Sequence, residues 1–327
     1  MDRFSKFAWK VAFTLGIMLG SLPALCQSYP SRPIQVILPF AAGTSLDNLA
    51  RLITAKLTER LGWTFIHDNR VGGDGVIAMQ ALMRAPADGH TLLGSIASLT
   101  VIPTTKKGQL PYDPLKDVVP LTRTINLQSV LAAHPGVPAN TLGEIIAYSK
   151  AHPGKLNFAT ASRGSSNHLL GELLKRETGL DMTNVPYKPG MQMQVDVMSG
   201  NVELVVVSAP TVVAYMPKVK PLVVLSERRF FGLPNVPAVG EVVKSLANVD
   251  MDIWGGLMVR AGTPREIVAR LHSEIVAVLR LPEVQQQIVA IGGAPVIDAT
   301  PDAAYKKYVG DIARWEKVIR ESKLQFE

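Results

Sequence analysis

Two separate segments combine small residues, hydroxyl side chains and the start of a helix. The first runs from Phe40 to Asp47, and the second runs from Thr160 to His168. A loop of this composition exposes backbone N–H groups at the positive end of a helix dipole, where a carboxylate or another anion is stabilised. Each loop alone could equally serve only as a helix cap and a tight turn. Two matched loops from distant parts of the chain favour a two-sided anion site.

Enzymatic and metal sites are weaker interpretations of the same residues. Ser165 and His168 are candidates for a nucleophile and a base, but neither Ser165 nor Ser166 lies in the G-x-S-x-G turn of α/β hydrolases. His168 and Glu172 are one helical turn apart, as metal ligands can be, yet the local spacing indicates no third ligand. We therefore expect no catalytic residue, no metal and no cofactor. An exported serine hydrolase that uses Ser165 or Ser166 is the remote alternative.

The elements around these loops alternate between strands and helices. Short apolar runs rich in branched residues predict strands over residues 34–40, 64–69, 91–96, 127–133, 157–160, 182–185, 203–207, 221–225 and 253–259. Helical spacing and capping residues predict helices over residues 47–61, 76–84, 141–151, 167–178, 191–199, 263–280 and 300–322, with Thr263 as the N-cap of the sixth. The segment Gly72–Gly75 lacks the Lys-Ser/Thr of a phosphate loop, and we interpret it as a turn.

This alternation predicts an α/β fold with parallel sheets that are covered by helices on both faces. In such sheets ligands bind at the carboxyl ends of the strands. Both small-residue loops follow the end of a predicted strand, so we expect the binding site there.

Composition and charge exclude several classes of protein. The chain has 327 residues, which is enough for two domains, and 47% of them are hydrophobic, which excludes a disordered protein. The net charge of +7 is spread out, because no run of Lys and Arg exceeds two residues. Diffuse charge is weak evidence for nucleic-acid binding, and we expect no nucleic-acid partner.

The N-terminus predicts export. Basic residues at Arg3, Lys6 and Lys10 precede an apolar run that ends at Leu25, which is the layout of a signal peptide over residues 1–26. The run is shorter than the roughly 20 residues that cross a bilayer. We therefore expect a periplasmic protein with the signal peptide removed. A lipoprotein acylated on Cys26 remains an alternative, although Leu25 is not the small residue that normally precedes such a cysteine.

Several short segments follow one another along the whole expected mature chain. They are residues 29–34 (YPSRPI), 39–47 (PFAAGTSLD), 86–93 (PADGHTLL), 110–117 (LPYDPLKD), 153–158 (PGKLNF), 164–169 (GSSNHL), 185–188 (VPYK), 233–237 (LPNVP) and 261–264 (AGTP). In this order they resemble the periplasmic solute-binding receptors of the tripartite tricarboxylate transporter family, the Bug or TctC type. Each segment alone is weak evidence, but together they are highly specific.

The resemblance implies a two-lobed α/β "Venus flytrap" with a mostly parallel sheet flanked by helices in each lobe. Residues 27–127 and 253–327 would form lobe 1 and residues 128–252 would form lobe 2, with crossings near Leu127 and Asp252. The protein would be a monomer that binds a small organic carboxylate between the lobes and delivers it to membrane transporter subunits. A sensing module that docks on a membrane histidine kinase is the alternative.

The resemblance also implies that the loop after the first strand and the Gly-Ser-Ser loop of the second lobe grip a carboxylate. The expected ligand contacts are Phe40, Ala42, Gly43, Thr44, Ser45, Asp47, Ser95, Ser98, Thr160, Ser162, Gly164, Ser165, Ser166, His168, Tyr187 and Ser208. Val207 and Ser208 stand where the family often has an Asp-Asn pair, and the first loop is poorer in glycine than is usual. A missing carboxylate removes an acceptor for an ammonium or hydroxyl group, so we expect a more apolar acid than an amino acid or citrate.

Overall fold

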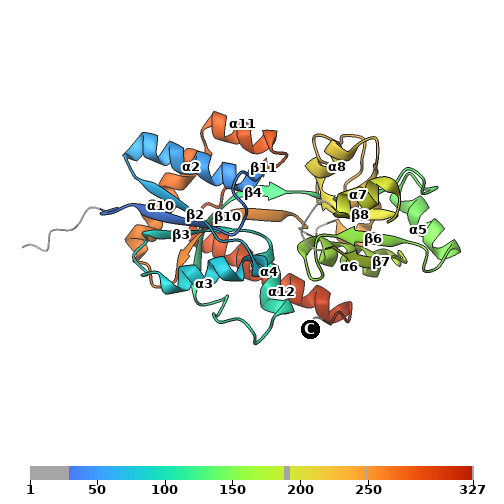
Figure 1. Cartoon of the computed structure of the whole chain (residues 1–327), viewed down its shortest axis with the longest axis horizontal. Helices are drawn as coiled ribbons and strands as arrows, with labels where there is room; N and C mark the ends of the chain where they lie inside the picture. Colours follow the sequence, from blue (N-terminus) through green and yellow to red (C-terminus); the bar gives the residue numbers. More distant parts are fainter. Residues whose placement is uncertain (1–28, 188–191, 248, 250, 326–327) are drawn as a thin grey trace, which may run out of the picture.

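The computed structural model describes residues 29–187, 192–247, 249 and 251–325 (Figure 1). The expected signal peptide and Cys26 lie outside these residues. In the described part of the chain, no helix has the length and apolar character needed to cross a membrane. Helices pack around two separate sheets, and each sheet with its helices is called a lobe below.

The first lobe is built on a six-stranded sheet with the order β11-β4-β10-β3-β1-β2. Its strands are β1 (Ile34–Leu38), β2 (Phe65–Asn69), β3 (Thr91–Ser95), β4 (Val118–Leu127), β10 (Ile253–Arg260) and β11 (Ala294–Pro295). Its helices are α2 (Ser45–Leu61), α3 (Val76–Arg84), α4 (Ser98–Thr105), α10 (Arg265–Leu279), α11 (Pro282–Ala290) and α12 (Pro301–Glu321), with the 3-10 helix η1 (Gly73–Gly75). Successive residues of β1 face opposite sides, since Val36 packs with α2 and α10 whereas Ile37 packs with α3 and α12. Helices therefore cover both faces.

The second lobe is built on a five-stranded sheet with the order β7-β6-β8-β5-β9. Its strands are β5 (Ser129–Ala133), β6 (Asn157–Thr160), β7 (Thr183–Pro186), β8 (Leu204–Ser208) and β9 (Lys220–Leu225). Its helices are α5 (Leu142–Ala151), α6 (Ser166–Thr178), α7 (Gln192–Ser199), α8 (Ala209–Tyr215) and α9 (Val239–Val242), with the 3-10 helix η2 (Lys244–Leu246). Leu131 of β5 packs with α5 and α6, and its neighbour Val130 packs with α7 and α8.

The expected α/β fold with two helix-flanked sheets is confirmed, but the sheets are mixed rather than mostly parallel. β1 is parallel to β2 and β3, and β6 is parallel to β7 and β8, whereas β4, β5 and β10 run antiparallel to their neighbours. The cause is the path of the chain between the sheets. It leaves the first sheet along β4 and returns along β10, and Leu127 pairs with Ile253, so the two adjacent strands run in opposite directions.

Two finer predictions are wrong. The single strand predicted over residues 127–133 is divided between the end of β4 and β5. Thr263 is not the N-cap of α10, because its hydroxyl donates to the carbonyl of Arg260 (2.7 Å) and Pro264 occupies the cap position.

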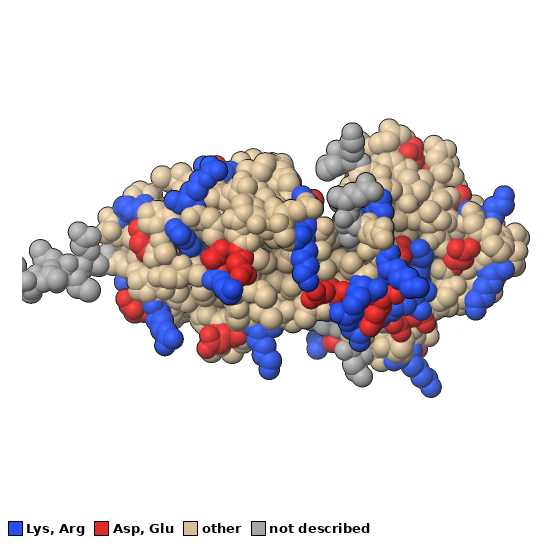
Figure 2. Space-filling model, turned by 90° about the horizontal axis from the view of Figure 1, so that it is seen from below, with Lys and Arg blue, Asp and Glu red and all other residues tan. Residues whose placement is uncertain are grey.

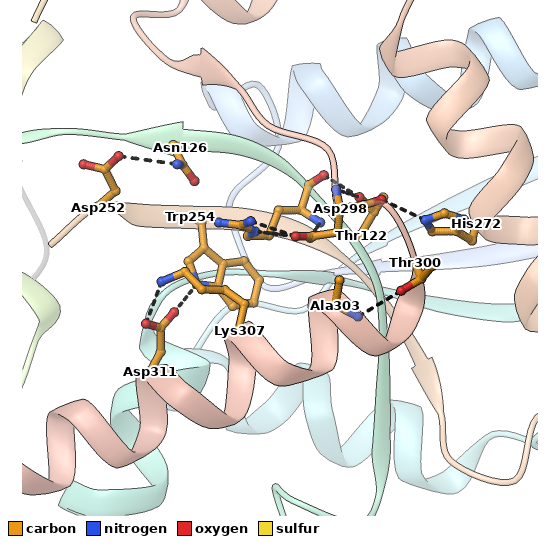
Figure 3. A network of polar contacts seen from close by, with 11 residues as sticks. Thr122, Asn126, Asp252, Trp254, His272, Asp298, Thr300, Ala303, Lys307 and Asp311 are labelled. Carbon is orange, nitrogen blue, oxygen red and sulfur yellow. Dashed lines mark hydrogen bonds and ion pairs between the residues drawn. The ribbon is translucent and has the colours of Figure 1, made fainter. Parts of the chain in front are cut away.

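Polar contacts fix the connecting strands within the first lobe (Figure 3). On β4, the backbone N–H and Nη2 of Arg123 donate to the carboxylate of Asp298 at 2.8 and 2.7 Å. On β10, Nε1 of Trp254 donates to Asp311 of α12 at 2.6 Å, and Lys307 pairs with the same carboxylate at 2.7 Å. Both carboxylates are buried, so the strands that lead to the second lobe are held by short, charge-assisted bonds.

Helix α12 packs against both lobes (Figure 1). Tyr308 lies among first-lobe residues, whereas Trp315 and Ile319 lie in the second-lobe cluster with β5 and α6. At the end of α12, Glu321 pairs with Arg176 of α6 at 2.6 Å. Figure 2 shows basic and acidic side chains intermingled on the second lobe close to the boundary. The helix therefore links the lobes in addition to the strand connections.

Candidate binding site

The loops at the carboxyl ends of β1, β2, β3 and β6 line one cavity of about 530 Å³. From the first lobe it is lined by Pro39, residues 71–75, residues 96–98 and the later part of α4. From the second lobe it is lined by residues 161–167, and Ile253 at the start of β10 also lines it. The cavity thus lies where helix N-termini follow parallel strands, which is the usual place for a ligand in an α/β protein.

The second-lobe loop is held by the first turn of α6. The hydroxyl of Ser165 accepts a hydrogen bond from the backbone N–H of His168 at 3.3 Å and so caps the helix. In return, Nδ1 of His168 accepts the backbone N–H of Gly164 at 2.9 Å. Gly164 has a φ of +79°, a left-handed conformation that favours glycine. These contacts fix the backbone on which Ser165 and Ser166 face the cavity.

The imidazole of His168 is neutral. It is 4% exposed, and burial, helped by the charges of Lys175 and Arg163, lowers its pKa to about 4. Its Nε2 approaches Glu172 at 3.8 Å, but a neutral ring makes no ion pair there. Because Nδ1 accepts the Gly164 N–H and Ser165 accepts the His168 N–H, the geometry gives no support to a serine nucleophile with a histidine base.

The first-lobe loop is held in a parallel way by Asp47. This side chain is 1% exposed, and its Oδ2 accepts the backbone N–H of Gly43 and Nε of Arg51, both at 2.9 Å. Its Oδ1 accepts Nδ2 of Asn69 at 2.8 Å, and the same amide donates to the carbonyl of Phe40 at 2.9 Å. The hydrogen bond from Arg51, with those from Asn69 and Gly43, lowers the pKa of Asp47 to about 2, so the carboxylate is ionised.

The structure brings only part of the expected contact set together. The residues of that set that line the cavity are Ser98, Ser162, Gly164, Ser165 and Ser166. Asp47 and His168 lie buried beneath the loops, whereas Ala42, Gly43 and Thr44 are exposed beyond the cavity lining. Ser45 borders a different hollow, beside α11, and Phe40 and Ser95 border a small one at the base of α2.

Three further residues of the set make hydrogen bonds away from the cavity lining. Thr160 is fully buried, and its hydroxyl accepts Nδ2 of Asn184 at 2.8 Å. The hydroxyl of Tyr187 donates to Asp196 at 2.9 Å. The hydroxyl of Ser208 shares a hydrogen bond with Thr211 at 2.7 Å.

Sequence reasoning missed the turn Gly72–Gly75, which lines the cavity. The hydroxyl of Ser98 donates to the carbonyl of Asp74 at 2.7 Å and joins this turn to α4. Gly75 has a φ of +100°, and a Cβ there would meet Leu99 at 3.0 Å, so the position requires glycine. The position of the turn in the sequence could have indicated it, because the turn follows a predicted strand and ligand-binding loops lie at the ends of strands.

No group of three or more His, Cys, Asp or Glu side chains among the described residues has an arrangement that could hold a metal ion. The polar partners of Asp47 are backbone, amide and guanidinium groups.

Comparisons with known proteins give a consistent set of relatives. A family model described as "Tripartite tricarboxylate transporter family receptor" matches residues 49–324. Protein BugT of Bordetella pertussis is 33% identical over 303 residues, which are 92% of each chain. A structure of an R. palustris protein with adipate has a TM-score of 0.78 at 29% identity and covers 91% of this chain and 99% of that one. MatC from Rhodopseudomonas palustris with bound malate has a TM-score of 0.73 at 28% identity, covering 89% and 100%.

Proposed function

The chain belongs to the tripartite tricarboxylate transporter family of receptors, and on that premise we propose that it binds a small organic carboxylate between its lobes and delivers it to a tripartite membrane transporter. The family consists of periplasmic substrate-binding receptors, not enzymes. Two relatives of known structure carry adipate and malate, which supports a carboxylate ligand here.

The observation that carries the proposal is the cavity lined by strand-end loops of both sheets. The loop before α6 presents backbone N–H groups and the hydroxyls of Ser165 and Ser166 at the positive end of a 13-residue helix. The start of α4, which includes Ser98, lines the cavity from the other lobe, and the positive end of this helix dipole also favours an anion. A carboxylate between the two helix starts would be stabilised from both lobes at once.

In this proposal residues 27–127 and 253–327 form lobe 1 and residues 128–252 form lobe 2, and the exported mature chain acts as a monomer. A ligand that contacts both lobes binds the closed arrangement better than the open one, so it shifts the population toward the closed form. Asp47 and His168 position their loops. The rim residues Ala42, Gly43 and Thr44 reach the ligand only when the lobes close.

The test is a thermal-shift and calorimetric screen of the exported protein against mono-, di- and tricarboxylates, aromatic acids and amino acids. A ligand that binds only the folded state at 100 times its Kd stabilises that state by about 2.7 kcal/mol. We expect one chemically coherent group of acids to raise the Tm.

The variant Ser162→Phe places a ring in the cavity lining and should abolish the shift. The control Ser199→Phe, at the exposed end of α7, should keep it. A well-folded wild-type protein whose Tm no acid raises would contradict the proposal, as would equal shifts in the two variants.

A further inference from the structure

The end of α12 lies between α4 of the first lobe and α6 of the second (Figure 1). Toward the first lobe, Nε1 of Trp315 donates to the hydroxyl of Thr100 in α4 at 3.2 Å. Glu316 pairs with Lys107, just beyond the same helix, at 2.9 Å. Because α4 lines the cavity, the last turns of α12 are fixed to one wall of the candidate site.

Toward the second lobe, the end of α12 is held by two arginines that flank α6. Arg176, in the last turn of α6, pairs with Glu321 at 2.6 Å. Arg163, three residues before α6 begins, donates from Nη2 to the backbone carbonyl of Gln325 at 3.0 Å. The 13 residues of α6 span about 20 Å, so the two arginines hold one short segment from opposite ends of this helix.

The chain turns after α12 to make the second of these contacts. Lys323 has a φ of +52°, the left-handed conformation in which many helices end. The N–H of Leu324 then donates to the carbonyl of Ile319 at 3.1 Å, and the Leu324 side chain packs against the hydrophobic cluster of the second lobe. This turn brings the carbonyl of Gln325 to Arg163. Residues 322–325 are called the C-terminal clasp below.

Arg163 belongs to the loop that lines the cavity from the second lobe, residues 161–167. On one side this loop is held by the bond from Gly164 to His168, and on the other by the bond from Arg163 to Gln325. Within the part of the chain that the structure describes, the clasp lies outside the cavity lining. An effect of the clasp on binding must therefore pass through the loop.

We propose that the C-terminal clasp positions the second-lobe ligand loop through Arg163, which makes Arg163 a positioning residue. This inference rests on the binding function proposed above and adds to it a support that lies outside the cavity. Because the end of α12 is also fixed to α4, the clasp determines how the loop lies relative to the opposite wall. A loop that is already ordered lowers the cost of binding.

The test loosens the clasp without changing the cavity. The side chain of Lys323 is exposed, so its replacement acts mainly through the backbone. Lys323→Ile introduces a β-branched residue, which disfavours a positive φ, whereas Lys323→Gly favours it. In the protein without added acid, hydrogen exchange of the amides of residues 161–167 should become several-fold faster in Lys323→Ile and stay as in the wild type in Lys323→Gly.

Calorimetry with adipate, malate and the other acids of the screen measures the effect on binding. Lys323→Ile and Arg163→Met should each weaken the binding of every acid that the wild type binds by about fivefold, the effect of one hydrogen bond. The order of preference among the acids should stay unchanged, because the cavity lining keeps its shape. Lys323→Gly should bind as the wild type does.

The double variant separates positioning from direct contact. If Arg163 acts through the clasp, Arg163→Met combined with Lys323→Ile should bind about as well as either single variant. Losses that multiply in the double variant would show that Arg163 meets the acid directly, and they would overturn the proposal.

The matched control is Glu321→Gln, which breaks the pair with Arg176 at the end of α6 that is remote from the ligand loop. It should leave both the exchange of the loop and the affinity within about twofold of the wild type. Unchanged loop exchange and affinity in Lys323→Ile would overturn the clasp and leave the proposed function standing. If no acid binds the folded wild type, the proposed function falls, and with it the role of the clasp in binding.

Discussion

At the scale of single residues, the two lobes hold their loops by the same local device. In each, a glycine N–H donates to a side chain four residues later in the first turn of a helix: Gly43 to Asp47, and Gly164 to His168. The acceptors differ in charge. Asp47 is ionised, with its pKa near 2, whereas His168 is neutral, with its pKa near 4. The two loops therefore respond differently to acid.

We expect His168 to make the stability of the protein fall between pH 6.5 and pH 4. The pKa of the folded state, about 4, lies below the ordinary value of 6.5, so the unfolded chain binds the proton first. The contribution of the neutral His168 ring to stability is complete above about pH 6.5. As the pH falls toward 4, the free energy of unfolding decreases by about 2 to 3 kcal/mol. The pKa of Asp47 is about 2 against an ordinary 3.8, so its contribution is lost only at lower pH.

The measurement is the free energy of unfolding from urea titrations at pH 7 and pH 4.5. His168→Leu should be less stable than the wild type at pH 7, because the Gly164 N–H loses its acceptor, but it should lose less stability on acidification. The exposed His152→Leu serves as the control and should follow the wild-type profile. A His168→Leu profile parallel to that of the wild type would count against a neutral buried ring.

At the scale of elements, α12 connects two hydrophobic clusters that belong to different lobes. Trp315 is 2% exposed, packs in the second-lobe cluster and donates Nε1 to the hydroxyl of Thr100 in α4 at 3.2 Å. One side chain thus joins a second-lobe core to a first-lobe helix. The ion pair between Arg176 and Glu321 is partly exposed and contributes less.

Trp315→Ala should lower the free energy of unfolding by about 3 to 5 kcal/mol, because it leaves a large cavity. Trp315→Phe keeps most of the apolar contact and loses the bond to Thr100, so it should cost about 1 kcal/mol. Glu321→Gln should cost less than about 1 kcal/mol. Denaturant unfolding of the three variants gives this order directly, and equal losses for Trp315→Ala and Glu321→Gln would show that α12 does not support the second-lobe core.

The alternation of strands and helices was predictable because buried strands and amphipathic helices leave different periodicities. Most of β4 could not be predicted from the sequence, because Pro120 lies inside it and a proline argues against a strand. The register of β4 explains why the strand accepts a proline. Pro120 pairs with Met258 of β10 on one side, whereas β11, on the other side, pairs only with Ile125 and Asn126. Among the described residues, Pro120 therefore has a strand on one side only.

The candidate site was predictable where local sequence determines structure. The segment from Ser162 to Ser166 reads as a loop before a helix, and its residues line the cavity. Burial depends on packing between distant segments. The sequence therefore could not show that Ser165 lines the cavity whereas His168 is buried beneath it. The turn at 72–75 follows a predicted strand, but its composition is that of any glycine-rich turn, and the pairing of β2 with β1 brings it to the site.

At the scale of the whole molecule, ligand binding depends on how closely the two lobes can approach. Besides the connecting strands and α12, one close contact between them joins Gly292, after α11 of the first lobe, to Pro210 in α8 of the second. A Cβ on Gly292 would overlap the ring of Pro210. We therefore expect this contact to limit how closely the lobes approach along that edge.

Gly292→Ala should separate the lobes along this edge and weaken ligand binding several-fold, because the closed arrangement becomes more costly. The matched control is Gly62→Ala: Gly62 has a φ of +69° against +79° for Gly292, but a Cβ there meets nothing within 4 Å. Both variants carry the backbone cost of an alanine in this conformation, about 1 kcal/mol. Small-angle X-ray scattering with and without ligand should show a smaller ligand-induced decrease in the radius of gyration for Gly292→Ala only. If both variants contract and bind as the wild type does, the contact between Gly292 and Pro210 does not govern closure.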